Sequence, residues 1–457
     1  MDFDLVIQNG TLVIGNQTMP ADIGISDGKI AAIAKGLSGR QTYSAQSMLV
    51  IPGGVDPHVH LEMPTPTTIT SDDWFTGTRA AAYGGTTTVI DFIEPEKDET
   101  LVEAFNKRRI QAEEKCVIDF SLHMTISRTD TSTLAEIPSV IRYGIPSFKL
   151  YTTYEGFALP DEGLLAAFNA VAQAGGLVLV HAENDAIIQY SISQLRSKGQ
   201  LEPKFYPLSR PAIAEVEAIR RVILLARFSG VPLYIVHIST ATGASAVEKA
   251  RYHGQNVFGE TCPQYLLLSQ NRYQDMDSLY AAGHICAPPL REPKDNLVLW
   301  RMLQNGTLQT VGTDHCAFNL HGHKDQGLDC FTNVPGGVPG VETRLALMYT
   351  YGVRKGFLTL EQWIDCCCTQ PAKIFGLAPR KGVLAVGADA DIVIFDPDYK
   401  VTITKSLLHE NVDYTPYEGF ELHGYPVATF LRGQLLVERG QWVGPEHQGH
   451  FVPRFPS

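Results

Sequence analysis

Strand-like apolar runs recur eight times through the middle of the chain, and segments of helical character separate them. The first run ends at His60, and the others span residues 86–92, 117–125, 146–151, 176–184, 232–240, 256–263 and 308–315. Helix candidates such as residues 101–115 and 214–230 lie between them. Strands that alternate with helices indicate parallel βα units. Eight such units over roughly 320 residues predict an α/β fold of the (β/α)8 TIM-barrel type, which needs about 250 residues before insertions.

A doubly wound parallel sheet is the alternative arrangement of repeated βα units. The nucleotide-binding proteins of that class carry a GxGxxG or GxxxxGK[ST] motif directly after a strand. Neither motif follows a strand-like run in this chain. The middle of the chain therefore favours the closed barrel.

Both ends of the chain differ from the middle, because they contain short strand-like runs separated by tight turns. The segment "DLVIQNGTLVIGNQTMPADIGISDGKIAAI" carries Asn-Gly and Asp-Gly pairs, which are typical of β-hairpins. The segments "GADADIVIFDPD" and "VATFLRGQLLVERGQWVG" repeat this character near the other end. We expect residues 1–52 and 378–457 to join in one small β-sandwich domain with a C-terminal tail. Residues 53–377 would then form the barrel domain.

Charge, hydropathy and cysteine spacing narrow the class of protein. A net charge of −12 argues against a nucleic-acid partner, which requires a basic face. The chain has no run of about 18 apolar residues that would predict a membrane span, and "MDFDLVIQNG" lacks the pattern of a signal peptide. The contiguous Cys366, Cys367 and Cys368 suit neither a disulfide framework nor a zinc knuckle and indicate a buried part of a late helix. Together these features predict a cytoplasmic protein.

Polar side chains gather at the carboxyl ends of the predicted barrel strands. In "GVDPHVHLEMP", residues 54–64, two histidines stand two residues apart, and such residues face the same side of a strand. Later strands end on further polar residues, and the full set is His58, His60, Lys149, His181, His237 and Asp314. Active sites of (β/α)8 barrels lie at this end of the strands. Six such residues together predict a metal site rather than separate hydrogen-bonded side chains.

The residue types predict two metal ions, and we expect these to be zinc. Neutral imidazole and carboxylate oxygen are the usual donors to zinc in hydrolytic sites. Four histidines, one Asp and a lysine exceed the needs of one tetrahedral ion, which points to two ions about 3.5–4 Å apart. An ammonium group repels cations, so Lys149 fits this set only after losing its charge. Reaction with carbon dioxide would convert it to a carbamate, N6-carboxylysine, that bridges both ions.

The chain resembles the amidohydrolase superfamily, and within it the hydantoinase/dihydropyrimidinase family, including its phenylhydantoinase-like members. The motifs that carry the resemblance run from end to end in the family order. They are "PGGVDPHVH" (52–60), "GGTTTVIDF" (84–92), "SFKLYTTYEG" (147–156), "VHAEN" (180–184), "YIVHIS" (234–239), "ETCPQYLLL" (260–268), "APPLR" (287–291), "TDHC" (313–316), "PAKIFGL" (371–377) and "GADADIVIFDP" (387–397). The resemblance implies the barrel and the β-sandwich, a binuclear zinc centre and a homotetramer.

The resemblance also implies a role for each site residue. His58, His60 and Asp314 match the ligands of the more buried ion, His181 and His237 those of the second, and Lys149 the carboxylated bridge. A hydroxide between the ions would attack the ring carbonyl of a cyclic amide. Asp314 would act as general base and then general acid, and Tyr154 matches the tyrosine that hydrogen-bonds the oxyanion. The product would be an N-carbamoyl amino acid from a 5-substituted hydantoin, or its β-analogue from a dihydropyrimidine.

Two positions depart from the family pattern and leave the substrate open. Ala287 stands where the family commonly has Ser, and Gly336 stands where many members have Asn. Both family residues contact the ring amide largely through backbone groups, so recognition of the ring can survive. Met63, Tyr151 and Phe157, on loops expected to rim the pocket, are candidates for contact with a ring substituent.

Other histidines and cysteines near strand ends favour structural roles. The second HxH, His321 and His323, lies in a polar, glycine-containing stretch that follows no strand, and we interpret it as a solvated loop. Cys262, Cys286 and Cys316 are too dispersed for a zinc thiolate site, so packing or pocket lining is expected.

Three alternative functions share the fold. A dihydroorotase would carry an Arg shortly after the first HxH to hold a carboxylate, whereas Leu61, Glu62 and Met63 follow here. The sequence does not distinguish an allantoinase from a hydantoinase. A non-enzymatic scaffold of the collapsin response mediator type lacks the metal ligands, whereas every ligand position is filled in this chain.

Overall fold

Eight parallel strands form the centre of the molecule, in the hydrogen-bonded order β13-β12-β11-β10-β9-β8-β7-β6. The structure is a computed structural model that describes residues 3–15, 17–65, 67–275 and 277–456. The strands are β6 (Gly54–Val59), β7 (Thr86–Ile93), β8 (Asp119–Thr125), β9 (Ser147–Tyr151), β10 (Leu177–His181), β11 (Leu233–Ile235), β12 (Val257–Thr261) and β13 (Thr310–Val311). Each overlaps a run predicted from the sequence. The predicted barrel is therefore confirmed.

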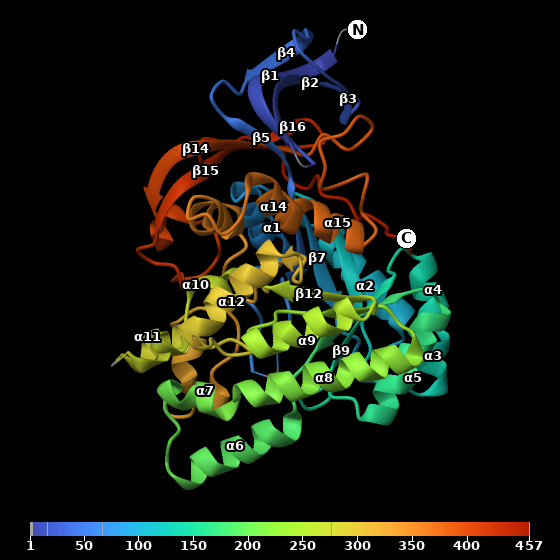
Figure 1. Cartoon of the computed structure of the whole chain (residues 1–457), viewed down its shortest axis with the longest axis vertical. Helices are drawn as coiled ribbons and strands as arrows, with labels where there is room; N and C mark the ends of the chain where they lie inside the picture. The colour runs from blue at the N-terminus through green and yellow to red at the C-terminus, as the bar shows by residue number, and fades with distance from the viewer. Residues whose placement is uncertain (1–2, 16, 66, 276, 457) are drawn as a thin grey trace.

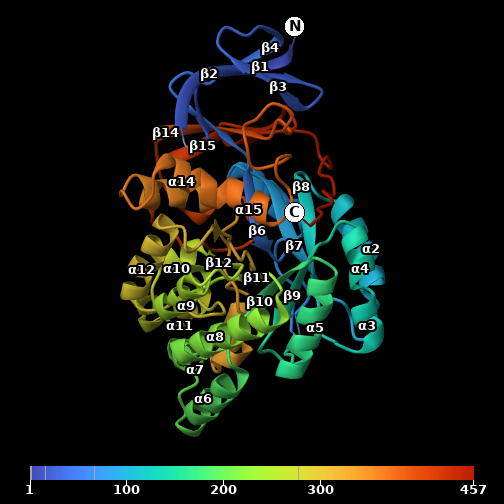
Figure 2. The same cartoon turned by 45° about the vertical axis from the view of Figure 1, so that its right-hand side comes forward.

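Helices surround these strands on the outside (Figure 1, Figure 2). They are α1 (Trp74–Tyr83), α2 (Leu101–Glu113), α3 (Thr131–Ala135), α4 (Ile137–Arg142), α5 (Asp161–Gln173), α6 (Asp185–Ser197), α7 (Tyr206–Ser209), α8 (Ala212–Ser229), α9 (Ala241–Tyr252), α10 (Pro263–Leu267), α11 (Ser278–Gly283), α12 (Pro293–Gln304), α13 (Arg344–Leu347), α14 (Leu360–Ile364) and α15 (Gln370–Ile374). In α8, Ile219, Val222 and Ala226 recur at helical spacing and are buried. Gly230, with φ 75°, ends this helix in the left-handed conformation that favours glycine.

Side chains close the barrel where β6 meets β13. One backbone bridge joins Val59 to His315, and the short β13 offers few further ladder bonds to β6. Arg344 is fully buried at this seam and donates from Nη1 to the carbonyls of Val55 and Val311, both at 2.9 Å. One guanidinium therefore fastens the first strand to the last, near the amino end of β6.

The last part of the chain fills the barrel interior at the amino ends of the strands. Val55, Ile90 and Tyr234 of the strands pack in one cluster with Phe375 and Val452. The side chain of Arg454 is fully buried at the same end of the barrel. Since side chains fill this end, the site is expected at the carboxyl ends of the strands.

Strands from both ends of the chain form one nine-stranded sheet above the barrel (Figure 1). Its members are β1 (Phe3–Ile14), β2 (Gln17–Ser26), β3 (Lys29–Ala34), β4 (Gly39–Ser44), β5 (Leu49–Pro52), β14 (Ile392–Thr402), β15 (Glu421–Leu431), β16 (Gln434–Glu438) and β17 (Gln441–Trp442). β5 pairs antiparallel with β14, which joins the two ends of the chain.

This sheet curls back on itself like a sandwich, although eight of its strands are hydrogen-bonded in one continuous path. β4 lies off this path and pairs with β1, so β1, β5 and β14 separate Tyr43 of β4 from Phe430 of β15. Their ring centroids are nevertheless 5.2 Å apart, because the sheet folds over a shared apolar core. The β-domain expected from both termini is confirmed, whereas its boundaries at residues 52 and 378 remain a prediction.

Two further predictions concern segments outside the strands. Cys366, Cys367 and Cys368 are buried, as predicted, and they lie in a π-helical turn between α14 and α15. Among the described residues, no helix is both long enough and apolar enough to cross a membrane.

Candidate active site

The six side chains predicted from the strand ends line one cavity of about 550 Å³. His58 is in β6 and His60 follows it directly, Lys149 is in β9, and His181 ends β10. His237 and Asp314 come two and three residues after β11 and β13, respectively. The chain brings them together because the carboxyl ends of parallel barrel strands meet at one rim.

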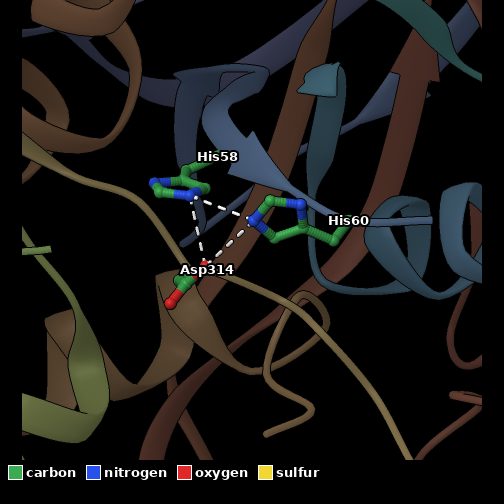
Figure 3. A group of neighbouring side chains, drawn as sticks. All are labelled: His58, His60 and Asp314. Atoms are coloured by element: carbon green, nitrogen blue, oxygen red, sulfur yellow. Dashed lines mark hydrogen bonds and ion pairs between the residues drawn. The ribbon is translucent and has the colours of Figure 1, made fainter. Parts of the chain in front are cut away.

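His58, His60 and Asp314 form the tightest group (Figure 3). Nε2 of His58 lies 3.3 Å from Nε2 of His60, so the two imidazoles point at one position, as their i, i+2 spacing predicts. Oδ1 of Asp314 lies 3.2 Å from Nε2 of His58 and 3.3 Å from Nε2 of His60. Burial raises the pKa of Asp314, but His58, His60 and Lys149 outweigh it, and the pKa lies below its ordinary value.

Glu260 of β12 sets the tautomer of His58. Its Oε1 accepts a hydrogen bond from Nδ1 of His58 at 2.7 Å, which leaves the lone pair on Nε2. The same carboxylate accepts from the backbone N–H of His237 at 2.9 Å and from the Tyr234 hydroxyl at 2.8 Å. Burial lowers the pKa of both His58 and His237 well below the ordinary value. Both imidazole rings are therefore neutral at pH 7, and each can offer a lone pair to a metal ion.

Glu183 and Arg210 orient the ring of His181. Nε2 of His181 lies 2.9 Å from Oε2 of Glu183, and Nη1 of Arg210 pairs with the same oxygen. Burial raises the pKa of Glu183, but Arg210 and His181 outweigh it and lower the pKa to about 2. Burial lowers the pKa of His181 itself. Because Glu183 holds Nε2, the lone pair of His181 is on Nδ1.

Lys149 is buried among aromatic rings and forms no ion pair with any residue that the structure describes. Its Nζ lies 4.9 Å from the ring centroid of Phe92 and 5.2 Å from that of Tyr151. Burial lowers its pKa to about 8. A lysine in this state has a much larger neutral fraction at pH 7 than an exposed one, and only the neutral amine reacts with carbon dioxide.

The donor set fits divalent metal ions. His58, His60 and Asp314 direct three acceptor atoms at one point, and these atoms lie within 4.8 Å of one another. Nδ1 of His60 has no hydrogen-bond partner among the described residues. Buried lone pairs that converge in this way repel one another unless a cation lies between them. The imidazole and carboxylate types are those of zinc sites, and Glu260 and Glu183 supply the outer hydrogen bonds such ligands require.

Three residues of the site have backbones in the left-handed region. The φ angles are 81° for Tyr154, 38° for His237 and 50° for Asp314. Each such conformation costs a side-chain-bearing residue about 1–3 kcal/mol and persists only where surrounding structure imposes it. The strain therefore coincides with the residues that the sequence predicts to be functional.

The other residues expected to bind substrate line the same cavity: Tyr154, Met63, Phe157, Ala287 and Gly336. Tyr154 and Phe157 come from the loop after β9, and Met63 from the loop after β6. Burial raises the pKa of Tyr154, so its hydroxyl is a proton donor throughout the neutral range. A Cβ placed on Gly336 would meet no atom within 4 Å.

His321, His323 and the dispersed cysteines lie outside the group that His58, His60 and Asp314 form. The His321 side chain is 74% exposed, and His323 contacts Ser71 and the backbone of Asn319. Cys262 and Cys286 are buried, and Cys316 lines the cavity wall.

Sequence reasoning missed the outer residues of the site. Glu183 lies in the motif "VHAEN" and Glu260 in "ETCPQYLLL". The spacing of two residues between His181 and Glu183 is the one sequence feature that could have indicated the role of Glu183. Arg210, Tyr206 and Ile192 enter the cavity from the segment between β10 and β11. The sequence pattern of that segment does not identify them, because a helix face that lines a cavity has the same residue pattern as one that packs into a core.

The chain matches the amidohydrolase family over residues 49–436, which is most of its length. The chain belongs to this family. D-hydantoinase of Geobacillus stearothermophilus is 43% identical over 453 residues, covering 98% of this chain and 96% of that protein.

Solved structures agree with this amidohydrolase assignment. The D-hydantoinase of a Bacillus sp. AR9 superposes with a TM-score of 0.97 at 42% identity and covers 99% of each chain. Dihydropyrimidinase from Brevibacillus agri NCHU1002 gives 0.97 at 41%, with 99% of this chain and 98% of that chain covered. The resemblance read from the motifs is confirmed, and this amidohydrolase is a hydrolase by family.

Proposed function

We propose that this amidohydrolase opens the ring of 5-substituted hydantoins, of dihydropyrimidines, or of both, and releases N-carbamoyl amino acids. The observation that carries the proposal is the convergence of six donor side chains from the ends of five strands on one cavity. Relatives named D-hydantoinase and dihydropyrimidinase match the chain over almost its whole length, which supports the substrate class.

We propose that two zinc ions are held by His58, His60, His181, His237 and Asp314, with carboxylated Lys149 as the bridge. The low pKa of Lys149 supports carboxylation, because the amine loses its proton at modest cost. When bound, the ions would lower the pKa of water and polarise the ring carbonyl. The Glu260 and Glu183 contacts keep two of the histidines in the tautomers that donate into the cavity.

The chain's own groups would then move the proton and stabilise charge. Asp314 would accept the proton of the attacking water and return it to the ring nitrogen that leaves. The low pKa of Asp314 keeps it ionised before the reaction. The Tyr154 hydroxyl would donate to the oxygen that becomes negative, a contact that gains strength only in the transition state.

Neutral aromatic and aliphatic side chains support an uncharged ring in the pocket. Met63, Phe157 and Tyr151 lie on the cavity wall, where they would exclude water from the ring. Ala287 and Gly336 would approach the ring amide through their backbone groups. We further propose a cytoplasmic homotetramer whose barrel spans residues 53–377.

Metal analysis and a substrate panel test the proposal. Purified protein should carry zinc, lose activity on chelation and regain it when zinc is returned. The panel is dihydrouracil, phenylhydantoin, methylhydantoin and allantoin. Ring opening of a hydantoin or of dihydrouracil supports the proposal. Protein without zinc that gains no hydrolysis on metal addition would overturn it, and preference for allantoin would identify an allantoinase instead.

A further inference from the structure

Glu94 is an acidic residue of the cavity wall that the proposed mechanism does not use. It follows β7 directly, is half-buried, and lines the same cavity as the six site residues. Within the described ranges its carboxylate forms no ion pair, and the Tyr151 hydroxyl donates to it across 3.5 Å. A full-strength O–H···O bond spans about 2.5–3.0 Å, so this carboxylate keeps most of its capacity to accept hydrogen bonds.

An aromatic wall stands beside this carboxylate. The ring centroid of Tyr151 is 5.4 Å from that of Phe157 and 5.9 Å from that of Tyr154, both edge-on. All three residues line the cavity together with Glu94. Aromatic faces next to a carboxylate favour an organic cation, because ring quadrupole and negative charge attract it together.

Apart from the proposed metal ions, the charged side chains of the cavity wall also favour a cation at this position. Arg210, a cation of the wall, is neutralised by its ion pair with Glu183. Glu155 adds a second carboxylate at the exposed rim, on the same loop as Phe157. Lys149 would become an anion on carboxylation. Among the described residues, no cationic side chain thus lies within ion-pair distance of Glu94, and His60, Arg108 and Lys149 act on it only from farther away.

We infer that Glu94 and the aromatic wall form a subsite for a cationic substituent on the substrate ring, and that ω-aminoalkyl hydantoins are a preferred substrate class. This inference rests on the proposed function, since it names the substituent of the ring that the same site opens. An ammonium group would give the carboxylate a charge-assisted hydrogen bond, whereas an alkyl group would leave it with only the long contact from the Tyr151 hydroxyl.

A matched substrate pair isolates this contact. In 5-(4-aminobutyl)hydantoin and 5-pentylhydantoin the side chains have the same shape, and an ammonium group replaces a methyl group. The measured quantity is the ratio of kcat/KM for the amine to that for the alkyl compound, at pH 8 with zinc-loaded enzyme. We expect E94Q to lower this ratio roughly tenfold or more, as the loss of a charged partner predicts. E94L should lower it further and raise kcat/KM for the pentyl compound.

A second glutamate on the same loop provides the control. Glu96 is 74% exposed in its side chain and pairs with Lys107, outside the cavity. E96Q removes the same charge from the protein and should leave the ratio unchanged. Y151F, which removes only the hydroxyl donor to Glu94, should change the ratio less than E94Q.

The outcomes separate the inference from the proposed function. A ratio that E94Q leaves within twofold of the wild type overturns the subsite. A fall in zinc content in E94Q, with equal losses on both substrates, also overturns it and assigns Glu94 to the metal centre. An enzyme that opens the ring of 5-pentylhydantoin but not that of 5-(4-aminobutyl)hydantoin refutes the subsite and leaves the proposed function intact. Failure to open any hydantoin or dihydrouracil ring refutes the proposed function.

Discussion

Nε2 of His181 donates to Oε2 of Glu183 across 2.9 Å, and this contact determines which ring nitrogen of His181 is available to a metal ion. Both side chains are buried, and Arg210 pairs with the same carboxylate. Glu183 therefore acts through His181 as a positioning residue.

Substitution of Glu183 tests this positioning role. E183Q keeps the shape of the side chain but removes the charge that holds the tautomer of His181, and it leaves Arg210 without its ion pair. We expect metal affinity or kcat/KM to fall about 10- to 100-fold, the usual effect of losing an outer hydrogen bond to a ligand. Zinc titration and steady-state kinetics measure it, with the 52% exposed Glu202 as the site of the control E202Q. Wild-type zinc affinity and wild-type kcat/KM in E183Q would contradict the role.

Lys149 should be indispensable for holding two ions. K149A removes the group that would be carboxylated, so we expect the zinc content to fall below two per chain and activity to be lost. A short carboxylic acid added to K149A should restore part of the activity, since it offers two oxygens in the vacated space. Full activity of K149A without any added acid would exclude the carbamate bridge. K204A, at a surface lysine 42% exposed in its side chain, is the control.

The Tyr154 hydroxyl should contribute mainly to kcat. Y154F keeps the ring and its contact with Arg210, whose Cζ lies 5.0 Å from the ring centroid, but removes the donor to the oxyanion. Loss of one such donor lowers kcat by about 10²- to 10³-fold with little change in KM. Single-turnover and steady-state measurements check this, with the 68% exposed Tyr190 as the site of the control Y190F. A change confined to KM would assign Tyr154 to ground-state binding.

Gly336 should accept an asparagine without loss of stability. Its Cβ position is open, so the carboxamide of G336N would extend over the cavity and offer a donor and an acceptor to the ring amide. We expect KM for dihydrouracil to fall roughly two- to tenfold, in line with one added hydrogen bond. The Tm should stay near the wild-type value, because no atom lies within 4 Å of this Cβ position and the backbone of Gly336 is outside the left-handed region. A large drop in Tm for G336N would contradict the open geometry.

A buried charge cluster between barrel and sheet should control acid stability. Nζ of Lys381 pairs with Asp389 at 3.0 Å and Asp391 at 2.7 Å, and also with Asp119 at the start of β8. Burial raises the pKa of Asp389, but Lys381, Lys29 and Arg380 outweigh it, and the pKa lies below its ordinary value. This stabilisation is present above the unfolded pKa of about 3.9 and is lost as pH falls through the lower folded pKa.

The substitution K381M tests the contribution of this charge cluster to stability. It leaves three carboxylates without their shared cation, so we expect the free energy of unfolding at pH 7 to fall by about 3–5 kcal/mol. Denaturant unfolding as a function of pH measures this. The gap in the free energy of unfolding between wild type and K381M should narrow below pH 4, because the carboxylates become protonated. A gap that stays constant from pH 7 to pH 3 would show that the loss arises from packing rather than charge.

The barrel and its donor residues were predictable because both depend on local patterns. Apolar runs of strand length, separated by helices, are visible without long-range information, and so is the HxH spacing of His58 and His60. Their convergence with Asp314 followed from one rule, that the carboxyl ends of parallel strands share a rim. The contacts that tune those donors were not predictable, because Glu260 is 202 residues from His58 and Arg344 is 289 residues from Val55.

The sequence by itself therefore determined the repeat of strands and helices, the strand-rich ends, and the residue types offered to a metal, since these follow from composition and spacing. The tertiary structure decided which nitrogen His58 and His181 present, how far the pKa of Lys149 falls, and that Glu94 has no ion pair within the described part of the chain while it lies beside an aromatic wall. These properties depend on burial and on the few ångströms between charged atoms, and only the folded chain brings those atoms together.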